Sequence, residues 1–248
     1  WVQYYAADGT DLGLSRVGSE VPVPADTARS GIYSDNYGVT YTGIEQLDVT
    51  GTRFVDLLIR GAQADVLRGG GGDDVLEGGG GNDTLDGGDG NDIFRAGNRP
   101  QRIDGGDGTD RLIVDFSDFA GDLVWSNDPA GTITLANGVT VTEVEALTLT
   151  TGAGNDELRN TAVVVSDVLS TGVGNDVIDA GGGNDTVNAG AGDDVIYQKD
   201  RGNDVIDGGE GNDRLILDYS GETSSRYSGI WVQYYAADGT DLGLSRVG

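Results

Sequence analysis

A nine-residue pattern repeats without a gap from Gly69 to Phe94, where the chain reads GGGGDDVLE, GGGGNDTLD and GGDGNDIF. The pattern is G-G-x-G-x-D-x-U-x, in which U is a large apolar residue. Glycine allows the positive φ angles of a tight turn. The last three residues of a block, for example Val75-Leu76-Glu77, suit a short strand with one side chain pointing inward. Each block therefore predicts one turn followed by one strand, the unit of a parallel β-roll.

Two blocks complete one coil of 18 residues, so the turns of alternate blocks stack on the same edge of the roll. Asp74 then lies above Asp92, about one strand spacing or roughly 4.8 Å away. Carboxylates this close repel by roughly 3 kcal/mol at an effective dielectric constant of about 20, so we expect a cation between them. Aspartate oxygens among turn carbonyls form a flexible, all-oxygen cage, which suits Ca²⁺. A disordered glycine-rich linker is the alternative, but linkers hold no nine-residue phase.

These blocks resemble the RTX repeats of proteins that Gram-negative bacteria secrete through a one-step (type I) export system. The resemblance implies a cage in which the aspartate and two carbonyls of one turn meet two carbonyls and the aspartate of the next turn on that edge. It assigns one ion to Gly69, Gly71, Asp74, Gly88, Gly90 and Asp92, and another to Thr171, Val173, Asp176, Gly190, Gly192 and Asp194. Secretion and an extracellular or cell-surface location follow from the resemblance alone.

The first predicted roll covers residues 51–113 as seven blocks in unbroken register. Its apolar column, expected to fill the core, is Leu58, Leu67, Leu76, Leu85, Phe94, Ile103 and Leu112. The sixth positions hold Asp56, Asp65, Asp74, Asp83, Asp92, Gln101 and Asp110. The first two blocks lack most turn glycines and the sixth block has glutamine, so we expect weak or absent metal binding there.

The second predicted roll covers residues 151–216, also as seven blocks, with insertions at Asn160-Thr161 and at Gln198. Its apolar column is Leu158, Leu169, Ile178, Val187, Ile196, Ile206 and Leu215, and its sixth positions are Asp156, Asp167, Asp176, Asp185, Asp194, Asp204 and Asp213. This roll is expected to hold more calcium than the first, and the two together roughly seven to nine ions.

The candidate calcium ligands are aspartates through their side chains and turn residues through their main-chain carbonyls. The aspartates are Asp74, Asp83, Asp92, Asp110, Asp156, Asp176, Asp185, Asp194, Asp204 and Asp213. The turn residues are Gly69, Gly71, Gly87, Gly88, Gly90, Gly106, Gly108, Thr171, Gly172, Val173, Gly174, Gly190, Gly192, Gly209 and Gly211.

The segment WVQYYAADGTDLGLSRVG occurs at residues 1–18 and again, unchanged, at 231–248. We expect either a tandem array of 230-residue units or a sequence designed to imitate one, of which this chain is a piece. The predicted fold is all-β: two parallel β-rolls separated and capped by short antiparallel β segments. The predicted parts are a cap at 1–50, the first roll at 51–113, a spacer at 114–150, the second roll at 151–216, and the next long spacer from 217 to 248.

The charge, 42 acidic against 15 basic side chains, argues against nucleic acid as a partner. No apolar run approaches the length of a membrane span, and we expect no membrane insertion. Cysteine and histidine are absent, which removes most zinc and nucleophile chemistry, and no nucleophile elbow or P-loop is present. We expect no enzyme. Aromatic residues outside the rolls, such as Trp125, are interpreted as small cap cores, with a sugar-stacking platform as the alternative.

Two function classes follow. The chain is either a calcium-stabilised unit of a giant extracellular protein, such as an adhesin stalk, matrix filament or surface layer, or the export and folding module of a secreted toxin or hydrolase. The long exact repetition favours the first class. Its expected partners are neighbouring copies of the same unit and components of a cell surface or matrix.

Overall fold

The computed structural model describes residues 46–59, 61–97, 99–126, 131–160, 164–199 and 202–220, together with the backbone of six strands nearer the two ends. These ranges contain strands, turns and irregular segments, and no helix in them could cross a membrane. The chain divides into two units, Trp1–Asp218 and Tyr219–Gly248. The all-β prediction is confirmed.

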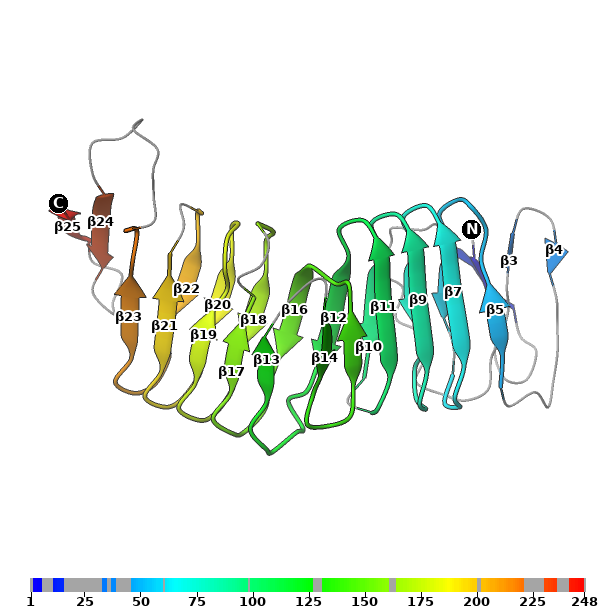
Figure 1. The fold of residues 1–248 in the computed structure, drawn as a ribbon, viewed down its shortest axis with the longest axis horizontal. Helices are drawn as coiled ribbons and strands as arrows, with labels where there is room; N and C mark the ends of the chain where they lie inside the picture. Colours follow the sequence, from blue (N-terminus) through cyan, green and yellow to red (C-terminus); the bar gives the residue numbers. More distant parts are fainter. Residues whose placement is uncertain are drawn as a thin grey trace. The chain divides into compact units, whose positions relative to one another are not determined.

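The roll in the first unit is built on one long sheet of eight parallel strands (Figure 1). In spatial order these are β6 (Leu57–Ile59), β8 (Val75–Glu77), β10 (Ile93–Ala96), β12 (Arg111–Asp115), β16 (Ala146–Thr150), β18 (Val168–Ser170), β20 (Thr186–Asn188) and β22 (Val205–Asp207). Strands of both predicted rolls and of the predicted spacer belong to this sheet. The two rolls therefore share one continuous layer.

Two shorter sheets supply the other strands of the coils. The first contains β5 (Asp48–Thr50), β7 (Val66–Gly71), β9 (Thr84–Asp89), β11 (Arg102–Asp107), β15 (Thr140–Thr142) and β14 (Thr132–Thr134). The second contains β13 (Val124–Ser126), β17 (Glu157–Arg159), β19 (Val177–Asp179), β21 (Val195–Gln198) and β23 (Arg214–Leu217). In these two sheets the chain adds each new strand parallel to the last, except at β14.

The spacer differs from the antiparallel segment that we expected. In the described part of the spacer only β14 pairs antiparallel, with β15, whereas β15 pairs parallel with β11 and β16 parallel with both β12 and β18. The reason lies in β16, which carries two inward leucines: Leu147 aligns with Leu112 of the first roll and Leu149 with Leu169 of the second. The spacer thus joins the rolls with a two-residue change of register.

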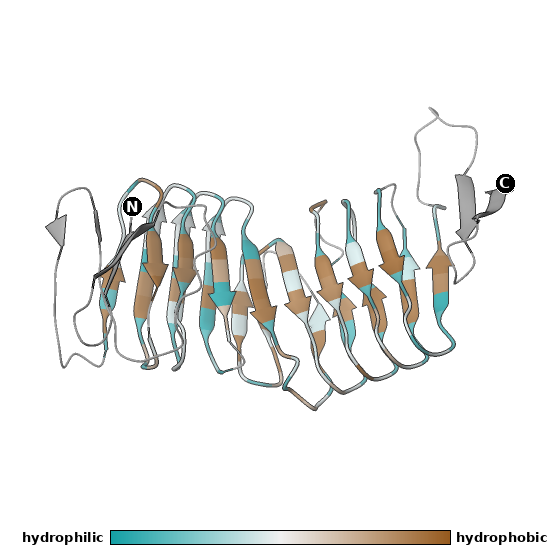
Figure 2. Cartoon of the chain, turned by 180° about the vertical axis from the view of Figure 1, so that it is seen from behind, coloured by the Kyte–Doolittle hydropathy of each residue, from teal (hydrophilic) through white to brown (hydrophobic). Residues whose placement is uncertain are grey.

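The apolar columns fill a single core, to which all three sheets contribute. Figure 2 shows the hydrophobic residues concentrated on the strands and the hydrophilic ones in the turns. The predicted column is buried from Leu58 to Ile196. Ile206 is partly buried, and Leu215 is 48% exposed because it lies on β23, the last strand of its sheet. The spacer adds the fully buried Phe116 and Trp125, which agrees with a packing role for these two aromatics.

The repeated terminal segment forms the same hairpin twice. Strand β1 (Val2–Tyr5) pairs with β2 (Asp11–Ser15), and β24 (Ile230–Tyr235) pairs with β25 (Asp241–Val247), each with a register irregularity at the corresponding tyrosine. A short hairpin also joins β3 (Tyr33–Ser34) and β4 (Tyr37–Gly38). Residues 127–130 of the predicted spacer, and the parts of 1–45 and 221–248 other than these strands, lie outside the described residues.

Candidate metal centre

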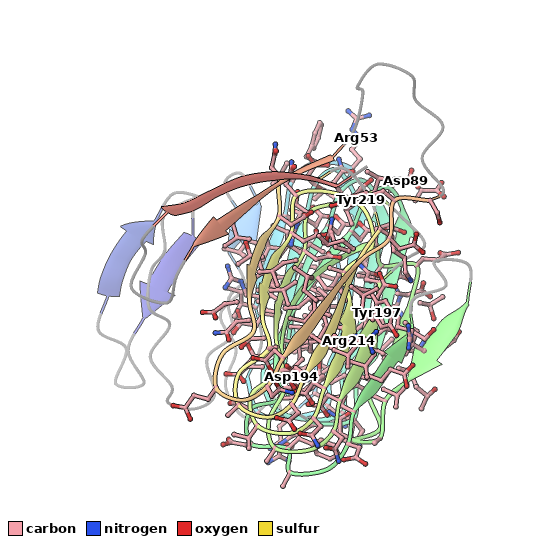
Figure 3. The ribbon with its side chains drawn as sticks, turned by 90° about the vertical axis from the view of Figure 1, so that its left-hand side faces the viewer. Arg53, Asp89, Asp194, Tyr197, Arg214 and Tyr219 are labelled. Carbon is pink, nitrogen blue, oxygen red and sulfur yellow. The ribbon has the colours of Figure 1, made fainter. Side chains whose placement is uncertain are left out.

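The sixth positions of the blocks form two rows, one at each end of the long sheet's strands. The leading row precedes these strands and holds Asp56, Asp74, Asp92, Asp110, Asp167, Asp185 and Asp204. The trailing row follows them and holds Asp65, Asp83, Gln101, Asp156, Asp176, Asp194 and Asp213. Figure 3 shows Asp89, from a leading-row turn, and Asp194, from a trailing-row turn, at opposite ends of the strands.

The turns stack from one coil to the next as the nine-residue pattern predicts. Gly70 aligns with Gly88, and Gly88 with Gly106. The fourth position of a turn must be glycine here: Gly90 has a φ of 137°, and a Cβ at this residue would lie 2.2 Å from the carbonyl oxygen of Gly72. Backbone therefore packs directly on backbone where these turns stack.

One oxygen of each stacked aspartate is fixed by the neighbouring coil. The N–H of Asp74 donates to Asp92 Oδ1 at 2.7 Å, and the N–H of Asp176 donates to Asp194 Oδ1 at 2.8 Å. The same contact joins Asp65 to Asp83 Oδ1 at 2.9 Å. These bonds confirm that alternate blocks bring their aspartates together, and they orient each carboxylate along the row.

The second oxygen of many of these carboxylates is buried and accepts no hydrogen bond. Among the described residues this is the case for Oδ2 of Asp74, Asp83, Asp92, Asp110 and Asp194, each of which is at most 1% exposed. A buried polar atom without a partner costs about 1–3 kcal/mol, and more when it is charged. Such a run of unpartnered carboxylate oxygens therefore calls for a cation.

Main-chain carbonyls of the next coil meet these oxygens. A Cβ built on Gly69 would lie 2.3 Å from Asp74 Oδ2 and 2.6 Å from the carbonyl oxygen of Gly87. A Cβ on Gly87 would lie 2.2 Å from Asp92 Oδ2 and 2.5 Å from the carbonyl oxygen of Gly105. In each case the carboxylate oxygen and the carbonyl oxygen both lie close to the place where a first-position glycine would carry its Cβ. A side chain at that glycine would therefore collide with both oxygens.

The electrostatics of the two rows disfavour ionised carboxylates in the absence of a cation. Burial raises the pKa of Asp74 and Asp83 to about 6, and in each case a neighbouring carboxylate adds to the shift. Burial, with Asp92, Glu145 and Glu143 nearby, raises the pKa of Asp110 to about 7. In the described ranges no three acidic side chains converge on one point, so a cation here would rely on carboxylate pairs and main-chain oxygens. That donor set suits calcium.

A family model described as "RTX calcium-binding nonapeptide repeat (4 copies)" matches residues 59–98, 166–196 and 200–218. The chain carries RTX calcium-binding repeats. A comparison with curated proteins gave no match. The matched segments include parts of both predicted rolls, and the predicted resemblance is thereby confirmed.

At three positions of the two rows a preceding side chain donates a hydrogen bond to the second oxygen of the sixth-position aspartate. The hydroxyl of Thr151 donates to Asp156 Oδ2. The side-chain amide of Asn160 donates to Asp167 Oδ2 at 2.5 Å, and that of Gln198 to Asp204 Oδ2 at 2.5 Å. We call these three the closed sites. Two of them, Asp156 and Asp204, are among the predicted calcium ligands.

From the sequence, Asn160 and Gln198 are predicted only as insertions that interrupt the nine-residue repeat. Their role as hydrogen-bond donors does not follow from that pattern. The signal was present, since each inserted segment carries an amide six or seven residues before a sixth-position aspartate. At these positions the amide N–H donates to the carboxylate oxygen that would otherwise face a cation. The buried carboxylate therefore has a partner without a bound metal ion.

The predicted carbonyl ligands lie on the turns as expected, and some of them already accept one hydrogen bond. The carbonyls of Gly172, Val173 and Gly190 accept N–H groups from adjacent coils. A carbonyl oxygen has two lone pairs, so these bonds leave one acceptor site each. Gln101 is buried at 3% exposure in the trailing row, and it brings an uncharged amide to the position above Asp83.

Proposed function

We propose that this chain is a calcium-stabilised structural unit of a secreted extracellular protein, such as an adhesin stalk, a matrix filament or a surface layer. The observation that carries the proposal is the convergence of an unpartnered carboxylate oxygen with a carbonyl of the next coil, repeated at Gly69, Gly87 and Gly105 along the leading row of the first roll. The RTX repeats themselves are calcium-binding repeats of a kind characteristic of secreted proteins.

In this proposal Ca²⁺ occupies the spaces between stacked RTX turns. The ligands of one ion would be Asp74 and Asp92 with turn carbonyls, and those of another Asp176 and Asp194 with theirs. The ions would offset a large part of the net charge of −27 and remove the repulsion between stacked carboxylates. The closed sites at Asp156, Asp167 and Asp204 would hold no ion or bind one weakly.

Calcium also gives the proposed unit a switch between compartments. Each strand of the roll is short, with most of its coil in turns, so apolar burial alone offsets little of the chain entropy. Extracellular calcium modules bind in the range of about 10⁻⁴ to 10⁻³ M. The chain would therefore stay unfolded in a cytosol of low calcium and fold after export from a bacterium, with a structural rather than a catalytic role.

The identical hairpins β1–β2 and β24–β25 support a unit that repeats. Neighbouring copies of the unit are the proposed partners, and calcium in their rolls would stiffen the array. Surface or matrix components would be bound by the assembled fibre.

Electron microscopy of a protein that contains several consecutive units tests this function. We expect continuous fibres of uniform width in millimolar calcium and their collapse in chelator. Freely jointed beads in saturating calcium would contradict the fibre and would favour the export module of a secreted toxin or hydrolase. Asp74→Asn together with Asp92→Asn is expected to shorten the ordered part of each unit, whereas Asp118→Asn, outside the rows, is the matched control.

A further inference from the structure

The leading row of carboxylates continues beyond the last block of the first roll. The N–H of Asp110 donates to Glu145 Oε2 at 2.8 Å, just as the N–H of Asp92 donates to Asp110 Oδ1 at 2.7 Å. Glu145 precedes β16, which pairs with β12 through Arg111 and Ala146. Glu145 therefore takes the place of a sixth-position aspartate, although it lies in the spacer and outside every RTX block.

The spacer reaches this place through a shortened turn. Thr142 aligns with Asp104, and Ala146 with Arg111, so Glu143 and Val144 replace the five turn residues 105–109 of the block below. Glu143 has a φ of 52° and is the one non-glycine residue of the described ranges with a positive φ. A left-handed glutamate is unusual, and the tight turn requires it.

This turn brings a carbonyl to the position that a first-position glycine holds elsewhere in the row. A Cβ on Gly105 would lie 2.6 Å from Asp110 Oδ2 and 1.7 Å from the carbonyl oxygen of Glu143. The same relation holds at Gly87 for Asp92 Oδ2 and the carbonyl of Gly105. Asp110 is fully buried, and its Oδ2 has no hydrogen-bond partner in the described structure.

No basic side chain of the neighbouring strand serves this oxygen. The guanidinium of Arg111 donates instead to the carbonyls of Leu147 and Ser166 and to Thr148 Oγ1. The groups around the unpartnered oxygen are thus a second carboxylate, that of Glu145, and main-chain carbonyls. An all-oxygen set with two negative charges is a site for a hard divalent cation.

We propose that Asp110, Glu145 and the carbonyl of Glu143 form an additional calcium site, the seam site, between the first roll and the spacer. The family match in this half of the chain ends at residue 98, and Glu145 belongs to no nonapeptide. An ion here would tie the spacer to the first roll at the β12–β16 junction, where the long sheet passes from one roll to the other. The seam site rests on the proposed calcium-binding function and extends it to residues without the repeat motif.

Native mass spectrometry of the whole chain in increasing calcium tests the seam site. Glu145→Gln keeps an oxygen that can accept the N–H of Asp110 but removes one charge, so we expect the saturated variant to bind one ion fewer than the unmodified chain. Asp118→Asn is the matched control, because it removes one charge from an exposed side chain outside the rows and outside the seam site. It is expected to bind the full number. An unchanged ion count and affinity for Glu145→Gln would overturn the seam site.

Failure of the calcium binding on which the proposed function rests gives a different result, because the unmodified chain itself would then bind no calcium. If Glu145→Gln does not regain the circular dichroism spectrum of the unmodified chain in calcium, a crystal structure of the unmodified chain with calcium decides the matter. An ion between Asp110 and Glu145 supports the seam site. A water molecule or direct contact there overturns it, even when ions fill the RTX turns.

Discussion

The side-chain amide of Asn160 lies 2.5 Å from Asp167 Oδ2, in the position where Asp74, Asp92 and Asp110 of the same row have no hydrogen-bond donor. The same amide donates to the carbonyl of Glu145 at 2.9 Å. One neutral residue thus bridges a buried carboxylate and the spacer at the start of the second roll. Asn160 is part of an insertion that lengthens this coil from 18 to 20 residues, as the contact of Asp156 with Asp176 shows. The insertion allows the coil to close without an ion.

Replacement of this amide should therefore destabilise the folded chain. Asn160→Ala leaves Asp167 Oδ2 buried without its donor, and we expect a loss of about 1–3 kcal/mol in the free energy of unfolding. Urea unfolding in saturating calcium, where the chain is folded and the closed site is expected to hold no ion, measures it. Asn212→Ala is the control, since the Asn212 contact to Asp193 uses the main-chain N–H. An equal effect of both substitutions would contradict the closed site.

The raised pKa values predict opposite effects of acid on the calcium-free and calcium-loaded chain. The folded-state pKa of Asp74 and Asp83 is about 6 and that of Asp110 about 7, against a reference of 3.8. Folding of the calcium-free chain therefore favours the protonated form. The stability that these three carboxyl groups contribute to the calcium-free fold is fully present below pH 3.8 and is lost as the pH rises through 6 to 7.

We expect the chain in chelator to gain β structure when the pH is lowered from about 7.5 to about 4.5, because protons then neutralise the stacked carboxylates. Calcium affinity should fall over the same range, because protons compete with the ion. Circular dichroism and calcium titrations at both pH values measure the two trends. Increasing loss of β structure on acidification in chelator would contradict the electrostatic account.

A methyl group placed between the converging oxygens should remove an ion. In Gly87→Ala the new carbon would lie 2.2 Å from Asp92 Oδ2 and 2.5 Å from the carbonyl oxygen of Gly105, so the two oxygens cannot hold their places. We expect fewer ions at saturation and a higher calcium midpoint of folding. Gly61→Ala is a matched control, since a Cβ there meets no atom within 4 Å. Equal calcium midpoints for the two variants would count against the convergence at Gly87.

The periodic part of the fold was predictable because a nine-residue phase fixes both the turn and the inward residue. Leu76 and Phe94 align in adjacent coils, and Asp74 and Asp92 meet as the phase requires. The spacer has no such phase. The two inward leucines of β16 fit the alternating pattern of any half-buried strand. Only the pairing of β16 with β12 of the first roll and with β18 of the second shows that the long sheet is continuous.

The non-periodic part of the candidate sites could not be predicted for the same reason. Glu145 reaches the row through a turn of different length, and no local pattern distinguishes it from an exposed acid. Asn160 and Gln198 act through the position of their amides, which depends on how each insertion folds. The exposure of Leu215 follows from its place on a terminal strand, which the column of apolar residues does not reveal.

Stacked carboxylates should also carry most of the calcium dependence. Alanine at Asp74, Asp92, Asp176 and Asp194 together removes one carboxylate pair from each roll, at positions that are buried and cannot rehydrate. We expect loss of ordered coils near these pairs even in millimolar calcium, while the core around Trp125 remains protected. Hydrogen exchange measured by mass spectrometry locates the effect. Uniform loss of protection over the whole chain would contradict local calcium sites.

Far-UV circular dichroism of the unmodified chain at about pH 7.5, with chelator and then with calcium, tests the central claim most directly. We expect little β signal in chelator, where the buried carboxylates face one another without a cation, and a cooperative gain of β structure as calcium rises through about 10⁻⁴ to 10⁻³ M. Magnesium at the same concentrations should act less, since its octahedral preference fits a flexible carbonyl cage poorly. A full β spectrum in chelator, unchanged by calcium, would contradict the claim that calcium holds this roll together.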